Sequence, residues 1–465
     1  MKLTPYQENA KALAALLGIE EDEAARRLQL RIAVTFDPDI AVSRDLAEYV
    51  VAMLGRTVEY AGVPDSGPFA AEVVIGPRTP ATSAPVKLYA GQEGADFVIR
   101  EGTPTQDRLS ETHRALLVIA ACYVAASAVR SALGPSFPIQ NTGSIVLRWP
   151  DLLGSLLDRL DVPIDIGETY LAGAGAVGNG FLYTLRHFDV RGTLNITDPK
   201  RVTVGGLNRC LLFSLEDVDY PKATRICKIA KPLFPGLRLV PLDMSLADAR
   251  KSRGKDFLIQ RLVVGVDSRR ARRSLQTELP GEVFDASTTD VREVVLHFNR
   301  QPTELACLSC IYPENERERE HEVNVAEALG VTPEEVRSGY IIESVARKIC
   351  GKYPECKLED LLGRAFDTLY KELCGLGRLQ DAQGQQVLAP FSFVSVLAGA
   401  YLALEFAVRT AEKNISSRFN YWRASPWRSP NLHLRQSRAR DPQCEFCSKP
   451  SFRRAIVQTW DRRLS

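Results

Sequence analysis

The spacing of apolar residues predicts an α/β region over residues 1–150. Some segments repeat apolar positions every three or four residues, as a helix does, and others carry short apolar runs typical of strands. Helices are predicted at Pro5–Leu17, Asp22–Leu28, Asp45–Leu54 and Glu111–Leu133. Strands are predicted at Arg31–Phe36, Glu72–Ile75, Val86–Ala90 and Phe97–Arg100. Pro135, Pro138 and Pro150 then predict a linker.

A second region begins near Asp151 and alternates strands with helices. The strands are predicted at 168–172, 194–196, 237–241, 262–266 and 283–285, with helices at 177–188 and 222–233. Such alternation favours a parallel sheet covered by helices. A charged, helix-rich stretch at 311–388 interrupts it, and an apolar helix at 390–409 follows. We therefore predict an α/β protein: a Rossmann-like, mostly parallel sheet, a helical insertion and a separate N-terminal α/β domain.

Length and composition are those of a globular protein with several domains. The 465 residues exceed one ordinary core, and a net charge of +2 gives no argument for nucleic acid. No signal peptide or membrane span is expected, and the apolar stretch Leu116–Val129 is interpreted as a buried core helix. In a chain this long, ten cysteines that include two CxxC pairs indicate metal-bound and free thiols in a reducing cytoplasm.

Gly173, Gly175 and Gly178 have GxGxxG spacing between a predicted strand and a predicted helix. Glycines let the backbone approach a phosphate, and the helix N-terminus supplies free N–H donors. NAD, FAD and ATP sites all use this arrangement. Asp198 lies about 20 residues further on, where a carboxylate usually accepts hydrogen bonds from ribose. The alternative role for Asp198 is a turn-forming residue before Pro199.

Three further segments favour ATP over NAD. Asn208 and Arg209 end the segment Thr203–Arg209, and an arginine there would stabilise charge developing on leaving pyrophosphate. Lys222 begins the next helix and would direct its charge at the α-phosphate. Taken alone it is more consistent with a solvated lysine, and its place beside Arg209 and Asp198 favours the phosphate role. Asp267 ends an apolar strand at the sheet edge, where a carboxylate would hold Mg²⁺. A dehydrogenase leaves these residues unexplained.

The two CxxC pairs are Cys307–Cys310 and Cys444–Cys447. Each pair presents two thiolates from one turn, and together they make a tetrahedral Cys₄ site for structural Zn²⁺. A redox CxxC would usually stand alone at a helix start. The five histidines show no metal-binding spacing.

The order of glycine loop, ribose aspartate, Leu-Asn-Arg, Pro-Lys and Asp-Ser resembles the adenylating domain of ubiquitin-activating enzymes and their bacterial relatives in thiamine and molybdopterin biosynthesis. The resemblance covers roughly residues 150–310 and 388–450. It implies Mg-ATP-dependent adenylation of the C-terminal glycine of a ubiquitin-like or sulfur-carrier protein. Asp198 would then bind ribose, Arg209 and Lys222 the phosphates, and Asp267 the metal.

The sequence departs from the family at three positions. Gly206 stands where the family usually has Asn, and Cys210 where Gln often follows the arginine. Val325 stands where many relatives carry the cysteine that forms a thioester. We predict that the nucleophile has moved to Cys374, before a Gly- and Gln-containing segment, with Cys350 and Cys356 as alternatives. The remaining cysteines are interpreted as packing residues: Cys122, Cys210 and Cys227.

We divide the chain into an N-terminal α/β domain (1–150), an adenylation domain (151–310), a helical cysteine-bearing insertion (311–388) and a tail that completes the adenylation domain and binds zinc (389–465). The N-terminal domain is interpreted either as a degenerate adenylation-like half or as a partner-recognition domain. We expect a homodimer that activates a ubiquitin-like protein, holds it as a thioester and passes it to a conjugating enzyme. Bacterial antiviral operons carry proteins of this layout, which extends the expectation to defence. The alternatives are a sulfur-carrier adenylyltransferase without a thioester and a non-catalytic scaffold.

One segment of the tail poses a separate question about partners. Arg418–Arg440 is rich in arginine, with Trp422 and Trp427 between the charges. Aromatic residues among cations are typical of single-stranded RNA binding. We favour a solvated surface or a dock for an acidic protein instead.

Overall fold

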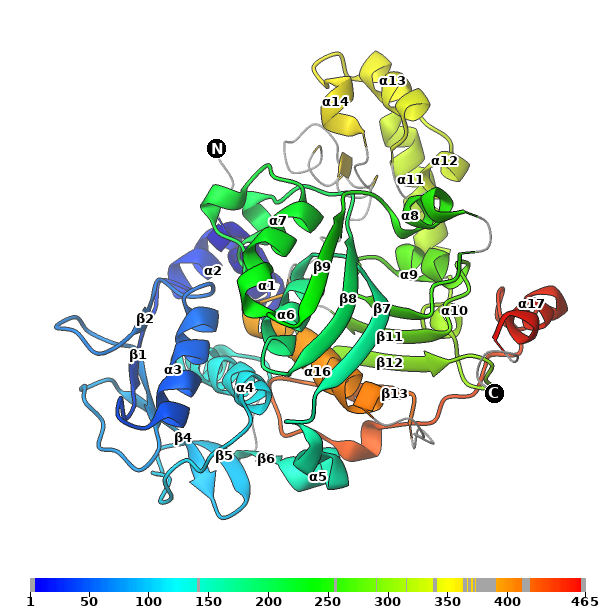
Figure 1. Cartoon of the computed structure of the whole chain (residues 1–465). Coiled ribbons are helices and arrows are strands. Elements are labelled where there is room, and N and C mark those ends of the chain that lie inside the picture. The colour runs from blue at the N-terminus through cyan, green and yellow to red at the C-terminus, as the bar shows by residue number, and fades with distance from the viewer. Residues whose placement is uncertain are drawn as a thin grey trace.

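The computed structural model describes residues 5–139, 143–254, 257–289, 291–314, 316–337, 341–362, 366, 369–370, 373, 390–411 and 419–460. Within these ranges the chain forms two sheets, each associated with helices. Figure 1 shows the N-terminal sheet in blue and cyan on one side of the larger green sheet, with a helical insertion in yellow above.

The N-terminal sheet has the strand order β2-β1-β3-β4-β5-β6. Its strands are β1 (Arg31–Thr35), β2 (Tyr60–Gly62), β3 (Ala71–Ile75), β4 (Val86–Glu93), β5 (Asp96–Glu101) and β6 (Ile145–Arg148). The pairs from β2 to β4 are parallel, and β5 and β6 are antiparallel to their neighbours. The helices of this region are α1 (Pro5–Leu17), α2 (Glu21–Arg27), α3 (Ala41–Leu54) and α4 (Arg114–Leu133).

Strand β6 lies inside the segment predicted as a linker, and that prediction is wrong there. Ile145 pairs with Ile99 of β5, and Ile145 and Leu147 are fully buried. Four residues between prolines carry too little periodicity to predict a strand. The partner strand and the core beneath it supply the stabilisation.

The larger sheet has the order β13-β12-β11-β10-β7-β8-β9. Its strands are β7 (Ile164–Ala172), β8 (Val190–Thr197), β9 (Leu237–Leu242), β10 (Arg261–Val264), β11 (Glu282–Thr288), β12 (Val294–Arg300) and β13 (Tyr421–Ala424). All pairs from β11 to β9 are parallel, and β12 and β13 add an antiparallel edge. Four helices follow strands of this sheet: α6 (Ala176–Leu185), α7 (Lys222–Ala230), α8 (Leu246–Arg253) and α9 (Arg269–Gln276). The predicted Rossmann-like, mostly parallel sheet is confirmed.

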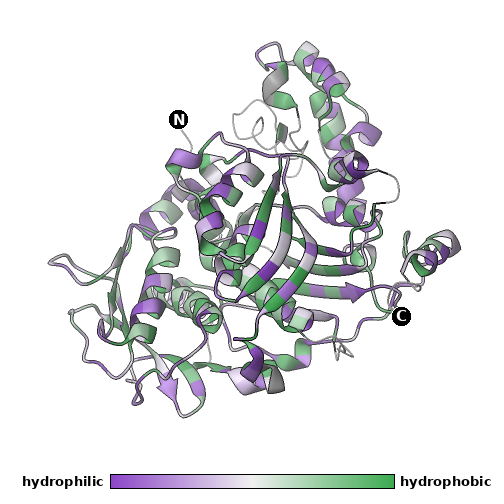
Figure 2. Cartoon of the chain, viewed as in Figure 1, coloured by the Kyte–Doolittle hydropathy of each residue, from purple (hydrophilic) through white to green (hydrophobic). Residues whose placement is uncertain are grey.

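One continuous core joins the two sheets, and helix α16 (Ser392–Ala411) runs through it. α16 packs on α6 and α4, and the Tyr401 hydroxyl lies 2.9 Å from the Tyr123 hydroxyl of α4. α4 and α16 are long and apolar enough to span a membrane, yet 78% and 89% of their most apolar windows are buried. Both are therefore core helices, as predicted for Leu116–Val129. Figure 2 colours the chain by residue hydropathy, with hydrophobic residues in green.

The helical insertion has a core of its own. It contains α11 (Glu316–Leu329), α12 (Pro333–Arg337), α13 (Glu343–Lys352) and α14 (Leu358–Leu361). The short helix α10 (Leu308–Ile311) precedes it and packs in the core of the larger sheet. Val325, at the position where relatives carry a cysteine, is fully buried in the core of the insertion. Ion pairs from α9 hold α11: Arg270 to Glu322 at 2.8 Å and Arg273 to Glu318 at 2.5 Å.

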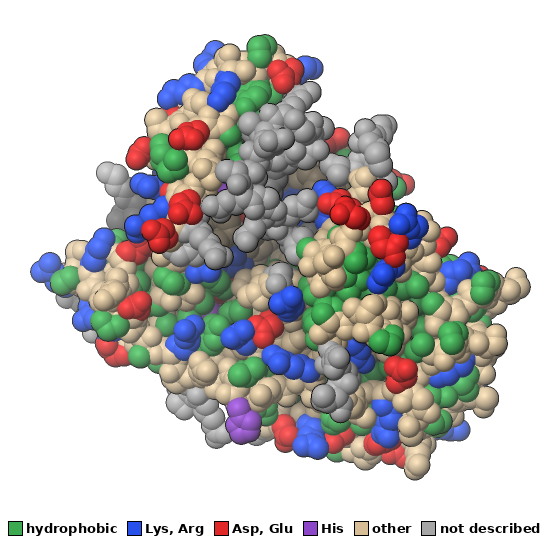
Figure 3. Space-filling view, turned by 180° about the vertical axis from the view of Figure 1, so that it is seen from behind, with side chains coloured by type: hydrophobic (Ala, Val, Ile, Leu, Met, Phe, Trp, Pro, Cys, Tyr) green, Lys and Arg blue, Asp and Glu red, His purple; other side chains and the backbone are tan. Residues whose placement is uncertain are grey.

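The two tryptophans of the arginine-rich segment 418–440 are buried. Trp422 and Trp427 have exposed fractions of 0% and 1%, so neither is available to stack on a base. Their indole N–H groups donate to the carbonyls of Asn431 and Val291. Figure 3 shows cationic and anionic side chains interspersed on the face seen from behind. Helix α17 (Pro450–Trp460) follows the second CxxC pair and packs in the same cluster.

Candidate active site

The glycine loop connects β7 to α6, and two of its glycines are required by the protein's own packing. Gly173 has φ +98°, and a Cβ there would lie 2.9 Å from the backbone of Gly265. A Cβ on Gly178 would overlap the carbonyl oxygen of Gly173. Gly175, the N-cap of α6, differs, because a Cβ there would meet no described atom within 4 Å. Gly175 therefore borders open space at a helix N-terminus, where an anion is favoured.

Asp198 follows β8 and lies against the glycine loop. Its carboxylate is buried, accepts a 2.9 Å hydrogen bond from the N–H of Ala174 and a 2.8 Å bond from the N–H of Lys200. These bonds fix the carboxylate beside the loop. The structure thus brings the predicted ribose ligand to the predicted phosphate loop.

Asp267 lies three residues beyond β10, with its side chain 74% exposed. Lys200 Nζ contacts Asp267 Oδ2 at 2.7 Å. Sequence reasoning missed Lys200, although its position directly after Asp198 and Pro199 was a signal. The pair places one cation and one exposed carboxylate at the edge of the sheet. A carboxylate oxygen is a hard ligand of the kind that Mg²⁺ prefers, so the side chain of Asp267 suits this ion.

Arg209 and Lys222 lie on the same side of the sheet. Arg209 donates from Nη1 to the Asn208 side-chain oxygen at 2.8 Å and to the Gly205 carbonyl at 3.1 Å. Lys222 begins α7, and its backbone N–H donates to the carbonyl of Lys200 at 2.9 Å. Asn208 is fully buried, so its side-chain oxygen contacts Arg209 from the protein interior.

The environment of Cys210 shows that the predicted residues converge. Burial raises the pKa of the Cys210 thiol, the charges of Arg209 and Lys222 lower it in part, and the charge of Asp198 raises it further. These three charged groups, together with Arg56, whose charge also lowers the pKa of Cys210, therefore lie near the same thiol. They come from the carboxyl side of the parallel strands, where ligands of open α/β sheets bind. Arg209, Lys222 and Lys200 supply cations suited to a triphosphate.

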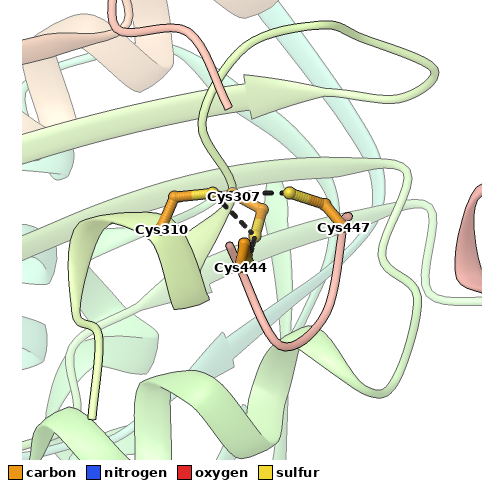
Figure 4. Close-up of side chains that lie close together, drawn as sticks. All are labelled: Cys307, Cys310, Cys444 and Cys447. Carbon is orange, nitrogen blue, oxygen red and sulfur yellow. Dashed lines mark hydrogen bonds between the residues drawn. The ribbon is translucent and has the colours of Figure 1, made fainter. Parts of the chain in front are cut away.

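The four CxxC cysteines converge although corresponding cysteines of the two pairs are 137 positions apart in the sequence (Figure 4). All four sulfurs lie within 4.8 Å of one another, with Sγ–Sγ distances of 3.7 Å for Cys307–Cys444 and 3.4 Å for Cys310–Cys447. Tetrahedral zinc with sulfurs at about 2.3 Å separates those sulfurs by about 3.8 Å. The N–H of Asp441 also donates to Cys310 Sγ at 3.3 Å. The donor set and spacing fit Zn²⁺.

The other cysteines have contrasting positions. Cys374, the predicted nucleophile, lies outside the described residues. Cys350 and Cys356 are half-buried and pack against the core of the insertion. Cys122 and Cys227, like Cys210, are buried, and burial raises the pKa of each thiol.

A buried polar network beneath the site was not predicted. Arg272 of α9 donates to Asp285 of β11 at 2.9 Å and to the Ala286 carbonyl at 2.7 Å. The Tyr312 hydroxyl donates to the other Asp285 oxygen at 2.6 Å. Tyr312 lies two residues beyond Cys310, so this network ties the helix after Asp267 to the zinc site. The arginine-rich sequence of α9 gave no signal that two of its arginines, Arg272 and Arg273, are buried.

Comparison with known families identifies this arrangement. Residues 167–446 match the ThiF family, and residues 3–140 match the E1 N-terminal domain. The chain therefore belongs to the ThiF family and has the architecture of E1-like adenylating enzymes.

Two relatives and one solved structure illustrate the likeness. The uncharacterized protein y4jF of Sinorhizobium fredii (strain NBRC 101917 / NGR234) is 28% identical over 63% of this chain and 58% of its own length. The NEDD8-activating enzyme E1 catalytic subunit of Arabidopsis thaliana is 32% identical over 28% of each chain. The matched segment thus spans little more than half of the first relative and under a third of the second. The crystal structure of E. coli MccB with succinimide covers 77% of this chain and 97% of its own, at 14% identity and a TM-score of 0.35.

Proposed function

We propose that this protein uses ATP to adenylate the C-terminal glycine of a ubiquitin-like protein. The observation that carries the proposal is the hydrogen-bonded arrangement beside the glycine loop. Asp198 accepts from the N–H groups of Ala174 and Lys200, and the Lys200 carbonyl accepts from the N–H of Lys222. Arg209 lies in the segment between Lys200 and Lys222. Three kinds of group that an adenylation site needs are present there. They are a ribose acceptor, phosphate cations and a backbone turn open to phosphate.

In the proposed reaction, a carboxylate oxygen of the partner's terminal glycine attacks the α-phosphorus of ATP. A new C(O)O–P bond forms, the bond from the α-phosphorus to the bridging oxygen breaks, and pyrophosphate leaves with that electron pair. Arg209 and Lys222 stabilise the negative charge that grows on the pyrophosphate. Asp198 orients the ribose, and Asp267 would hold Mg²⁺. When bound, Mg²⁺ neutralises triphosphate charge.

The second proposed step moves the acyl group from AMP to a cysteine thiolate. The thiolate attacks the acyl carbon, the C–O bond to AMP breaks, and AMP leaves. We assign this role to Cys374, with Cys350 and Cys356 as alternatives, and propose transfer from there to a conjugating enzyme. A cytoplasmic homodimer with a role in antiviral defence completes the proposal. Light scattering of the purified chain tests the dimer.

The second candidate is sulfur-carrier adenylation without a thioester. The observation that favours it is the buried Val325, because a core position of the insertion holds a valine where many relatives carry the nucleophile. In that case, adenylation would be the complete reaction of this chain.

Exchange of labelled pyrophosphate into ATP tests adenylation, with a glycine-terminated protein encoded beside this chain as partner. We expect partner-dependent exchange that Arg209→Ala reduces at least about 100-fold, the scale of removing one charge-stabilising donor. Arg191→Ala, at the exposed start of β8, is the matched control and retains exchange. Absence of exchange with every such partner would favour the scaffold.

A thiol-cleavable adduct, identified by mass spectrometry, separates the two catalytic candidates. Thioester chemistry predicts an adduct that is lost in Cys374→Ser while exchange persists. Persistence of the adduct in Cys374→Ser moves the nucleophile to Cys350 or Cys356. Exchange without any adduct supports the sulfur-carrier candidate.

A further inference from the structure

The segment that carries Arg209 depends on other parts of the chain for its shape. Residues 203–213 contain one short 3-10 helix, Val204–Gly206. On one side, the Asn179 side-chain oxygen of α6 accepts a 2.9 Å hydrogen bond from the N–H of Leu212. On the other side, the contacts come from the N-terminal region, over 150 residues earlier in the sequence.

Arg56, just after α3, holds the backbone on both sides of Arg209. Its guanidinium donates to the Leu207 carbonyl at 3.1 Å and to the Phe213 carbonyl at 2.8 Å. Burial lowers the pKa of Arg56. A planar guanidinium with two fixed carbonyl acceptors restrains both ends of this turn at once.

Asn9 of α1 connects Arg56 to the side chain of Arg209. Its amide donates to the Arg56 carbonyl at 2.6 Å, and its oxygen accepts from the Asn208 amide at 2.9 Å. The Asn208 oxygen then accepts from Arg209 Nη1 at 2.8 Å. Asn9 and Asn208 are both fully buried, so water does not replace these bonds. The amide of Asn208 is oriented by Asn9, and its oxygen therefore faces Arg209.

We infer that Asn9 and Arg56 are positioning residues for Arg209, so the N-terminal region completes the nucleotide site. An arginine side chain has many rotamers, and restricting it to one costs conformational entropy. If Arg209 is already fixed before ATP binds, that entropy is not lost on ATP binding or when charge builds up on the leaving pyrophosphate. The role of Arg209 on phosphate rests on the proposed function. The restraint of Arg209 by Asn9 and Arg56 rests only on the geometry.

Hydrogen exchange of the full-length protein tests the restraint without ATP. We expect Arg56→Met and Asn9→Ala to speed amide exchange in 203–213 by at least about tenfold, the equivalent of losing about 1.4 kcal/mol of local stability. Arg44→Ala is the matched control, an exposed arginine of α3 whose guanidinium bonds to the Pro38 carbonyl, and it leaves that exchange unchanged. Unchanged exchange in both test variants would overturn the inference.

Binding of Mg-ATP by titration calorimetry tests the consequence. We expect Asn9→Ala to weaken Mg-ATP about tenfold in the natural background and less than twofold in the Arg209→Ala background, because its effect passes through that arginine. An equal loss in both backgrounds contradicts positioning. Where Asn9→Ala does not fold, Asn208→Asp serves instead, since it keeps an acceptor for Arg209 and loses the donor to Asn9. Failure of the natural protein to bind Mg-ATP refutes the proposed function and leaves the exchange result to judge the restraint.

Discussion

Replacing Cys444 by serine tests whether one zinc ion ties the tail to the larger sheet. The zinc site would cross-link Cys307 and Cys310 to cysteines 137 positions later. The chain-entropy relation for a closed loop of that length gives about 5 kcal/mol of stabilisation. Loss of the Cys444 thiolate also removes a metal ligand from the buried cluster that contains Phe446 and Trp460. We expect the free energy of unfolding to fall by up to that amount.

The assay combines metal analysis with urea denaturation. We expect the natural protein to contain one zinc per chain, and Cys444→Ser to lose the metal and unfold at lower urea. A strong chelator shifts the natural protein in the same direction and leaves the variant unchanged. Cys356→Ser, in the insertion and outside the cluster, is the matched control and keeps its zinc. A Cys444→Ser protein with one zinc per chain and an unaltered urea midpoint would refute the cross-link.

Three further predictions concern the core and the site. Gly178→Ala lowers the melting temperature, because the added Cβ overlaps the carbonyl oxygen of Gly173. Gly175→Ala leaves the melting temperature unchanged, because its Cβ enters open space. The same variant weakens the binding of Mg-ATP at least about tenfold in calorimetry, because that space would hold phosphate. Arg272→Met costs about 3–5 kcal/mol in urea unfolding, since it leaves the Asp285 carboxylate buried without its cation. In the folded protein, burial lowers the pKa of His187 to about 3. In the unfolded chain the same histidine has its ordinary pKa of about 6.5, so it binds a proton at a higher pH than in the folded protein. Stability is therefore lost from pH 6.5 toward 3, and urea midpoints fall less steeply in His187→Gln.

Each of these has an outcome that contradicts it. Equal melting temperatures for the two glycine variants would show that the loop has room at both positions. An Arg272→Met protein as stable as the natural one would show that Asp285 finds another partner or protonates without cost. Parallel pH dependences for the natural protein and His187→Gln would assign the acid sensitivity to other groups.

Local patterns were sufficient wherever one segment contained its own signal. The apolar runs of β7, β8 and β10 and the amphipathic α7 were predicted because burial on a sheet or a helix face imposes a period on adjacent residues. β6 and β13 were not predicted, because the pairing that stabilises them joins separate parts of the chain: β6 pairs with β5, and β13 pairs with β12. The Asp285–Arg272–Tyr312 network was missed for the same reason, since its members lie on three separate elements.

The sequence by itself determined the order of the nucleotide-binding residues and the donor set of the zinc site. Both are choices of residue type at set spacings, and glycine, carboxylate, guanidinium and thiolate have the same chemistry in any fold. Only the tertiary structure decided that the cysteine pairs meet and that Asn9 and Arg56 support the segment of Arg209. Those contacts join residues more than 130 positions apart, and packing of the shared core, rather than any local preference, brings them together.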